Sequence, residues 1–136
     1  ILGWTSITNE VNILPLILYF GAIFWTLGYD TIYGFQDIKD DEIIGLKSTS
    51  IKFKSHPYLF LKLCYLIFLI CLITIGLLSK FNPVYFVFLF IVTLQMYYFQ
   101  IYKLDINKMN SCLMIFKSNN YLGLIVFLSL LIGKIT

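Results

Sequence analysis

The chain has 136 residues, of which 60% are hydrophobic and only 12% are charged, and its mean hydropathy is +0.87. Soluble domains carry about one quarter charged residues, so this composition excludes an ordinary soluble domain. The formal net charge is +3. All the basic residues are lysines, however, and they are spread over loops instead of forming a patch, which argues against a nucleic-acid partner. The three cysteines lack zinc-type spacing and are expected to be buried and reduced.

Four long apolar stretches follow one another along the chain. A helix that crosses the hydrocarbon core needs about 20 residues, and the sequence lacks the alternation typical of transmembrane strands. We therefore predict an all-α, integral membrane helical bundle with about four transmembrane helices. The last apolar run is short, so its helix is expected to begin earlier, between Asn110 and Phe116. The predicted spans are 13–30, 58–78, 84–102 and 116–134.

The lysines are distributed unequally between the segments that join these spans. Four follow the first span, one follows the second, three follow the third and one lies in the tail. Because lysine-rich loops stay on the cytoplasmic side, we expect Asp30–Pro57 and Lys103–Asn119 to lie in the cytoplasm and both chain ends outside. The predicted location is a bacterial inner (plasma) membrane, crossed several times.

Acidic residues gather in one segment, because five of the seven lie within thirteen positions that begin at Asp30. If the first helix continues, Asp37 and Asp41 fall within about 20° of Asp30, and Tyr33 lies about 60° away. Two carboxylates about 4 Å apart repel by roughly 4 kcal/mol at an effective dielectric near 20, and a divalent cation removes that cost. Mg²⁺ prefers one or two carboxylates together with substrate phosphates. The spacing favours Asp37 and Asp41 as its ligands and Lys47 as a phosphate contact. A solvated, charged loop end is the alternative.

The twenty residues from Tyr29 to Ser48 read YDTIYGFQDIKDDEIIGLKS. They closely resemble the second aspartate-rich motif of UbiA-type membrane prenyltransferases, with the pattern YDTxYxxxDxxDDxxxGxKS. Within that family, the segment most resembles the branch that prenylates 4-hydroxybenzoate. Trp4–Pro15 and Phe116–Leu128 are similar to two further stretches of the same family.

The resemblance implies a reaction and a set of site residues. A polyprenyl diphosphate is bound through Mg²⁺, and its allylic carbon alkylates the ring of 4-hydroxybenzoate ortho to the hydroxyl. The lipid bilayer is the surrounding medium. By position in the motif, the implied catalytic metal ligands are Asp37 and Asp41, the supporting acids of the metal site are Asp30 and Asp40, and the substrate or phosphate contacts are Tyr33 and Lys47.

The chain also departs from this family. UbiA-type enzymes have a first motif of the NDxxDxxxD type and nine transmembrane helices, whereas this sequence contains no such motif and four spans. We therefore interpret residues 1–136 as the C-terminal part of the domain, equivalent to its last four helices. A separate N-terminal half would then be a partner. Two other readings stay open: a catalytically inactive remnant, and a small multispan protein that transports or handles cations.

Two kinds of polar residue outside the acidic segment stand out. Gln95 and Gln100 lie within the third span and are expected to face other helices, where they can be hydrogen-bonded. His56 is the only histidine and precedes Pro57 in a lysine-rich loop, where a solvated side chain is favoured over a general base.

Overall fold

The computed structural model describes residues 3, 6, 7, 9, 12–38, 43–45 and 47–135. These residues contain helices and no strand. The elements are α2 (Ile13–Gly34), α4 (Thr49–Lys52), α5 (Pro57–Leu78), α6 (Pro83–Leu94), η1 (Gln95–Tyr102) and α7 (Met109–Ile135).

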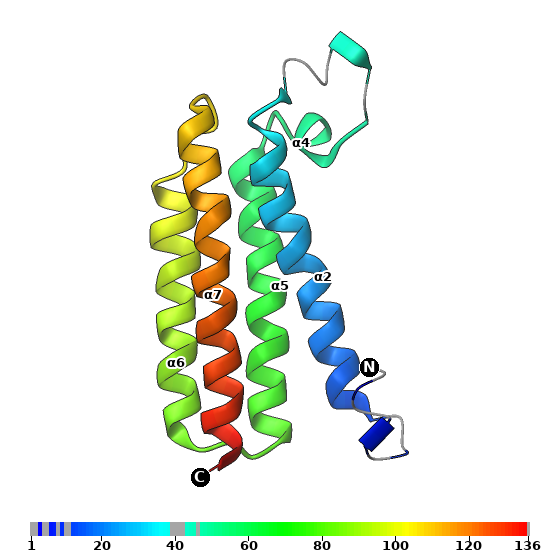
Figure 1. Cartoon of the computed structure of the whole chain (residues 1–136), viewed down its shortest axis with the longest axis vertical. Helices are drawn as coiled ribbons and strands as arrows, with labels where there is room; N and C mark the ends of the chain where they lie inside the picture. The colour runs from blue at the N-terminus through cyan, green and yellow to red at the C-terminus, as the bar shows by residue number, and fades with distance from the viewer. Residues whose placement is uncertain are drawn as a thin grey trace.

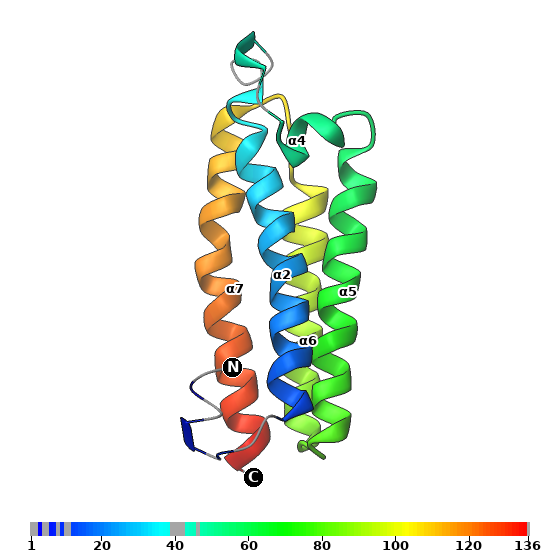
Figure 2. The same ribbon diagram turned by 90° about the vertical axis from the view of Figure 1, so that its right-hand side faces the viewer.

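Four long helical segments run alternately up and down as a bundle (Figures 1 and 2). The third of them is α6 continued by η1. The short helix α4 lies at one end, which we call the α4 end, and the turn between α5 and α6 lies at the opposite end. All four segments are long and apolar enough to cross a membrane. The predicted helical membrane bundle is therefore confirmed, and the chain is a multi-pass membrane protein.

Local sequence signals fix where the helices begin. The Asn12 side chain accepts a hydrogen bond from the Leu14 N–H and caps α2, and Asn82 caps α6 in the same way. Pro57 and Pro83 occupy first-turn positions, where the missing N–H costs little. Such caps satisfy N–H groups that have no partner within the helix.

Two helices are longer than their apolar runs indicate. Helix α2 continues to Gly34 instead of residue 30, and α7 begins at Met109, ahead of both 116 and the window from Asn110 onward. The added turn of α7 is held by burial, because the Cys112 and Ile115 side chains are fully buried. Lys117 consequently lies on a helix and not in a loop.

The helices approach one another closely where glycine faces a neighbour. A Cβ atom built on Gly28 would lie 2.6 Å from Cε1 of Tyr65, and one on Gly21 would lie 2.8 Å from Cβ of Cys71. Both distances are too short for real atoms, so these glycines allow α2 to pack tightly against α5. The three cysteines are buried and unpaired, as predicted.

A buried polar network joins all four helical segments. The Tyr65 hydroxyl donates to Gln100 Oε1 at 2.6 Å, and Gln100 Nε2 donates to Ser118 Oγ at 3.2 Å and to Asn119 Oδ1 at 3.1 Å. Trp25 Nε1 donates to the same Asn119 oxygen at 2.9 Å. Gln100 therefore faces other helices, as expected from the sequence. It lies in η1, a stretch of π-helix, a form that often marks functional positions.

Candidate functional site

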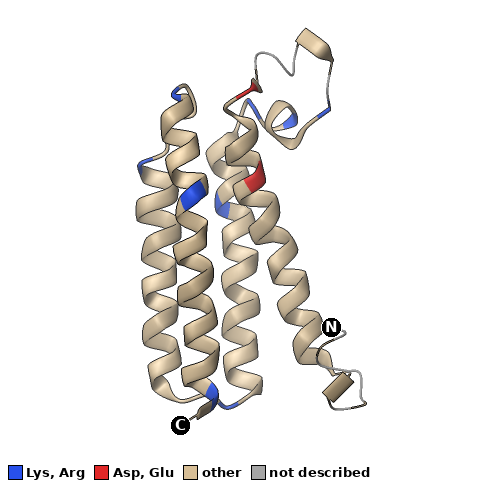
Figure 3. Ribbon diagram, viewed as in Figure 1, with Lys and Arg blue, Asp and Glu red and all other residues tan. Residues whose placement is uncertain are grey.

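The last turns of α2 bring the first candidate residues to the α4 end of the bundle. Asp30 and Tyr33 are three residues apart on this helix, and both side chains are exposed. The Tyr33 ring packs against Phe116 of α7, with 4.8 Å between ring centroids. Figure 3 shows the acidic positions on α2 and just beyond its end, with many of the lysine positions nearby. An acid, a phenol and an aromatic ring therefore share this end of the molecule.

Helix α2 stops at Gly34, so the predicted helical stripe is wrong beyond Tyr33. Phe35 turns inward and is 4% exposed, while the Gln36 N–H donates to the Tyr33 carbonyl at 3.0 Å. A Cβ on Gly34 would collide with the Ser50 hydroxyl, so glycine is needed where α4 crosses α2. Asp37 lies in a bend after the helix, and its side chain is exposed.

Asp40 and Asp41 lie outside the residues that the structure describes. The proposed pairing of Asp37 with Asp41 therefore stays a prediction. Exposure of Asp37 is compatible with it, because a metal ligand needs a carboxylate that is accessible to ion and substrate.

Hydroxyl groups join α2 to α4 at the two ends of the connecting loop, residues 35–48, which we call the acidic loop. The Thr31 and Thr49 hydroxyls are 2.8 Å apart, and the Ser50 hydroxyl donates to the Thr31 carbonyl at 2.9 Å. Ser48 caps α4 by accepting a hydrogen bond from the Ile51 N–H at 3.3 Å. The chain thus leaves α2 after Gly34 and returns to it at α4. Sequence reasoning missed this structural role, although three consecutive hydroxyl residues signalled it.

Lys47 stands at the returning end of this loop. It is exposed and immediately precedes the helix cap Ser48, and Gly45 before it has a φ of +78°, a conformation that favours glycine. The contacts of Thr31 with Thr49 and Ser50 therefore keep Asp37 and Lys47 at the same end of the bundle, the α4 end.

Gln36 is a further polar residue of the loop. Its Nε2 atom is the one buried side-chain nitrogen or oxygen without a hydrogen-bond partner in the described part of the chain. Buried donors are rarely left unpaired, so this amide next to Asp37 is a candidate donor to a bound ligand. Nothing in the sequence pattern distinguished it from an exposed loop glutamine.

Aromatic rings connect the candidate site to the buried polar network. The Tyr29 ring lies 5.8 Å from Phe116 and 5.6 Å from Trp25, between centroids, and Trp25 stacks on Phe68 at 5.3 Å. Because Trp25 is also bonded to Asn119, the ring positions at the site depend on the network in the bundle. The contacts of Tyr29 with Phe116 and of Trp25 with Phe68 and Asn119 join different helices, and the sequence alone did not indicate them.

The donor groups of the acidic segment suit a hard cation. Residues 30–48 contain carboxylates, hydroxyls and amides but no histidine or cysteine, the ligand set that favours Mg²⁺ over zinc. The described residues alone contain no group of three acidic, histidine or cysteine side chains close enough to hold a metal. His56 is exposed, and its Nδ1 contacts Ser55 at 3.0 Å, as expected for a solvated loop residue.

Another acid at the α4 end is already paired. Asp105 lies in the loop between η1 and α7, and its carboxylate is 3.2 Å from the Lys108 ammonium. The backbone N–H of Asn107 and the neighbouring Lys108 hold the pKa of Asp105 below its ordinary value. Asp105 is therefore an internally stabilised loop acid and not a candidate ligand.

The fold and the acidic loop define a multi-pass helical membrane protein with a polar segment at one membrane face. The profile of the UbiA prenyltransferase family matches residues 1–131, so the chain belongs to the UbiA family. This confirms the family that the Tyr29–Ser48 motif indicated.

Two curated relatives illustrate the similarity. The mitochondrial 4-hydroxybenzoate polyprenyltransferase of Bos taurus is 39% identical over 136 residues, which cover 99% of this chain and 36% of that protein. The 4-hydroxybenzoate octaprenyltransferase of Pasteurella multocida is 37% identical over 137 residues, which cover 96% of this chain and 47% of that protein. The chain thus spans less than half the length of these relatives. No solved structure shows significant similarity to it.

Proposed function

We propose that this chain is part of a membrane enzyme that transfers a polyprenyl group from polyprenyl diphosphate to the ring of 4-hydroxybenzoate, with Mg²⁺ as cofactor, in ubiquinone biosynthesis. The observation that carries the proposal is the closed loop at the α4 end, with Asp37 and Lys47 exposed on it, in a chain of the UbiA family. Relatives named for this reaction with 4-hydroxybenzoate support the choice of acceptor.

Five charged residues of the Asp30–Ser48 segment have roles in this proposal. Asp37 and Asp41 hold Mg²⁺, and Asp30 and Asp40 supply further carboxylates. When held by these residues, Mg²⁺ would supply Lewis-acid chemistry that eases departure of the diphosphate from the allylic carbon. Lys47 pairs with a phosphate oxygen as a point charge.

The uncharged residues act on the two substrates. Gln36 Nε2 donates a hydrogen bond to a diphosphate oxygen, which would satisfy its buried amide. Tyr33, held against Phe116, contributes an aromatic surface beside the reacting groups. The allylic carbon forms a C–C bond with the ring carbon ortho to the hydroxyl, and diphosphate and one proton are released.

The chain supplies one side of this site. We infer that it corresponds to the last four helices of a nine-helix enzyme and that an N-terminal half, separate or joined, supplies the first aspartate-rich motif. The α4 end would face the cytoplasm of a bacterial inner (plasma) membrane, because Lys47, Lys52 and Lys54 gather there, whereas Lys80 follows α5 at the opposite end.

The test is an assay in membranes that contain this chain together with its proposed N-terminal half. Polyprenyl diphosphate and 4-hydroxybenzoate are supplied with Mg²⁺ or with a chelator, and the prenylated product is measured by mass spectrometry. We expect product only with Mg²⁺ and none from a variant that carries Asp37→Ala and Asp41→Ala. Full activity in that variant would contradict the metal assignment.

The same membranes separate the two other readings. Absence of product from the unmodified protein, in membranes where a UbiA relative is active, would favour a catalytically inactive remnant. Magnesium or proton flux into sealed vesicles, without product, would favour a cation-handling protein. The location of the described acids outside the bundle interior supports the transferase over a cation path.

A further inference from the structure

Helix α7 exposes polar side chains within its membrane-spanning length. Lys117, Asn120 and Tyr121 are all exposed, and their spacing of three and four residues places them on one side of the helix. We call these three residues the polar face of α7. In the described part of the chain, no hydrogen bond or ion pair engages their side chains. Their donors and acceptors are therefore open to another molecule.

A groove of about 440 Å³ lies beside the polar face, between η1 and α7. Lys117 and Tyr121 line it together with Gln95 of η1. The Gln95 amide is partly buried and has no hydrogen-bond partner among the described residues either. The sequence predicted that Gln95 faces another helix, but within the described bundle it faces this groove. The groove therefore has unpaired polar groups on both of its walls.

The polar face lies deep enough in the membrane for this to matter. Helix α7 has 27 residues, or about 40 Å, so about 5 Å extends beyond each side of a hydrocarbon core of about 30 Å when the helix is centred. Tyr121 is twelve residues from the start of α7, which places it about 13 Å inside that core. A lysine can extend its stem to the headgroups, but the Asn120 and Tyr121 polar groups are too deep to reach them. Unpaired polar groups at such depth normally face protein.

The outward surfaces of α5 and α6 show what this chain exposes elsewhere at membrane depth (Figures 1 and 2). Every exposed residue of 63–78 and 84–94 is hydrophobic. The two threonines of these segments, Thr74 and Thr93, donate to carbonyls of their own helices, each at 2.8 Å. The polar face of α7 differs in both respects, so it does not resemble a surface that faces lipid.

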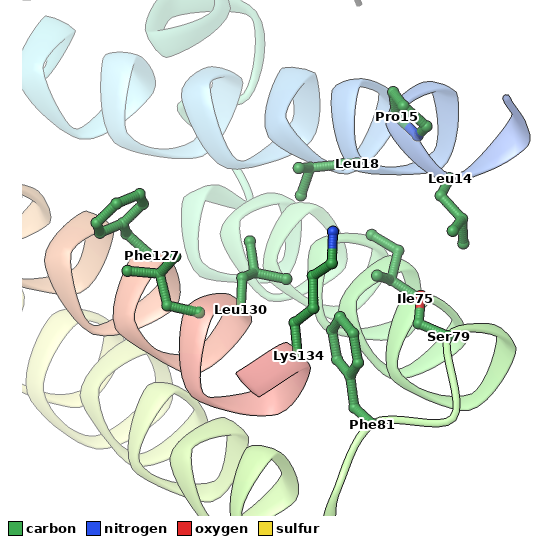
Figure 4. A pocket seen from close by; sticks show the side chains of 10 residues that line it. Leu14, Pro15, Leu18, Ile75, Ser79, Phe81, Phe127, Leu130 and Lys134 are labelled. Carbon is green, nitrogen blue, oxygen red and sulfur yellow. The ribbon is translucent and has the colours of Figure 1, made fainter. Parts of the chain in front are cut away.

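An apolar cavity of about 470 Å³ lies farther along α7, toward the end opposite α4 (Figure 4). Leu18 of α2, Ile75 of α5 and Leu130 of α7 are among the hydrophobic side chains that line it. Lipid tails and protein side chains are equally apolar, so this cavity is compatible with either. The polar face, and not the cavity, indicates what covers α7.

Charge favours a different polypeptide segment over a second copy of this chain. Most homodimers are isologous, and a dimer formed through the polar face would bring two Lys117 ammonium groups close together. An ionisable group within a membrane is normally paired with one of opposite charge. The curated relatives are more than twice as long as the segment that matches this chain, so a protein of that length has further helices to supply such a group.

We propose that the polar face of α7 is the docking surface for a transmembrane helix of the proposed N-terminal half. A carboxylate of that helix pairs with the Lys117 ammonium, and its polar side chains are hydrogen-bonded to Asn120 and Gln95. The inference rests on the N-terminal half included in the proposed function, but not on the metal and diphosphate roles of the acidic loop.

Photo-crosslinking in membranes tests the location of the contact. The chain is produced together with its proposed N-terminal half, and photoreactive p-benzoylphenylalanine replaces Tyr121, Tyr33 or Ile70 in turn. Position 121 probes the polar face, position 33 probes the candidate site, and position 70 is an exposed hydrophobic position of α5. After irradiation, the crosslinked peptides are identified by mass spectrometry.

We expect position 121 to crosslink to one helix of the N-terminal half and position 70 to crosslink to lipid. A crosslink to the N-terminal half from position 33 but not from 121 would overturn this inference and leave the proposed function intact. Absence of that crosslink from both positions would overturn the two together. A crosslink from 121 to a second copy of this chain would also overturn the inference.

The charge pair is tested by the strength of association. Energy transfer between fluorophores on the two halves is measured in vesicles for the unmodified chain, Lys117→Gln and Lys62→Gln. Lys62 is the matched control, because it is an exposed lysine of α5 outside the groove. Lys117→Gln should weaken association about three- to twentyfold, the range of polar contacts between membrane helices, with unchanged helicity. Equal association of the two variants would contradict an acidic partner for Lys117.

Discussion

Gln100 and Asp37 are both polar residues in a chain that is 60% hydrophobic, but their surroundings differ. Gln100 is fully buried, and its side chain is hydrogen-bonded to Tyr65, Ser118 and Asn119. Asp37 is exposed in a bend beyond the end of α2. The polar groups of the buried network are hydrogen-bonded to one another inside the bundle, whereas the Asp37 carboxylate in the loop at the α4 end is exposed.

This difference separates two reasons for keeping polar residues in a membrane protein. Hydrogen bonds between helices stabilise and align the bundle. Exposed acids contribute little to folding, so a cluster of them at one membrane face is better explained by a ligand. Substitutions in the two regions should therefore affect different properties, stability in the network and activity in the loop.

The largest effect is expected from Asp37→Asn. Loss of one carboxylate from the proposed metal site should lower prenyl transfer by at least about a hundredfold, since even second-shell changes at metal sites cost 10–100-fold. Thermal unfolding should be unchanged, because the side chain is exposed. Asp105→Asn, an acid at the same end that is paired with Lys108, is the control and should retain activity. Equal losses of activity in the two variants would contradict a specific role of Asp37 in binding metal.

Gly28→Ala should act on stability instead. The added methyl group would meet the Tyr65 ring at 2.6 Å, and that ring is held by its bond to Gln100. Overpacking of this kind costs about 1–3 kcal/mol. The unfolding free energy in detergent measures it, and Gly3→Ala, which meets nothing within 4 Å, is the control. Equal stability of the two variants would mean that α2 can move away from α5 without cost.

Gln100→Leu should have a somewhat smaller effect. The leucine leaves the Tyr65 hydroxyl without its acceptor and removes two bonds to α7, at an expected cost of about 1–2 kcal/mol. Gln95→Leu, at the first position of the same π-helix, is the comparison and should be nearly neutral, because Gln95 is only partly buried, unlike Gln100. A neutral result for Gln100→Leu would show that the network does not stabilise the bundle.

The smallest effect concerns pH. The pKa of Asp105 is lowered in the folded protein, so its ionised carboxylate favours folding above the ordinary value of 3.8, and this contribution is lost as the pH falls through the lower folded pKa. The melting temperature of Asp105→Asn should therefore lie slightly below that of the unmodified protein at neutral pH. The two should converge in acid. A difference in melting temperature that grows as the pH falls would contradict the lowered pKa of Asp105 in the folded protein.

The sequence was sufficient for the bundle because membrane crossing depends on local composition. Apolar runs located the helices without any knowledge of tertiary contacts, and Pro57 and Pro83 stand at the starts of α5 and α6. The end of α2 was not predictable in this way, because it depends on Phe35 entering the core and on the approach of Ser50 to Gly34.

The family was predictable from the sequence, whereas the contacts around the acidic segment were not. The Tyr29–Ser48 pattern located the acidic loop and its family. The partners that shape its surroundings are distant in sequence: Trp25 and Asn119 are 94 positions apart, and Tyr33 contacts Phe116. Helical periodicity within one segment contains no information about such contacts.

Binding of a prenyl diphosphate measures the role of the Asp30–Ser48 segment most directly. Geranyl diphosphate would be titrated, with and without Mg²⁺, into the chain reconstituted with its proposed N-terminal half, in unmodified form and with Asp37→Ala and Asp41→Ala. We predict binding that requires Mg²⁺ and is lost in the variant, while its melting temperature is unchanged. Binding of equal strength in both forms, or without Mg²⁺, would contradict a metal and diphosphate site in this loop.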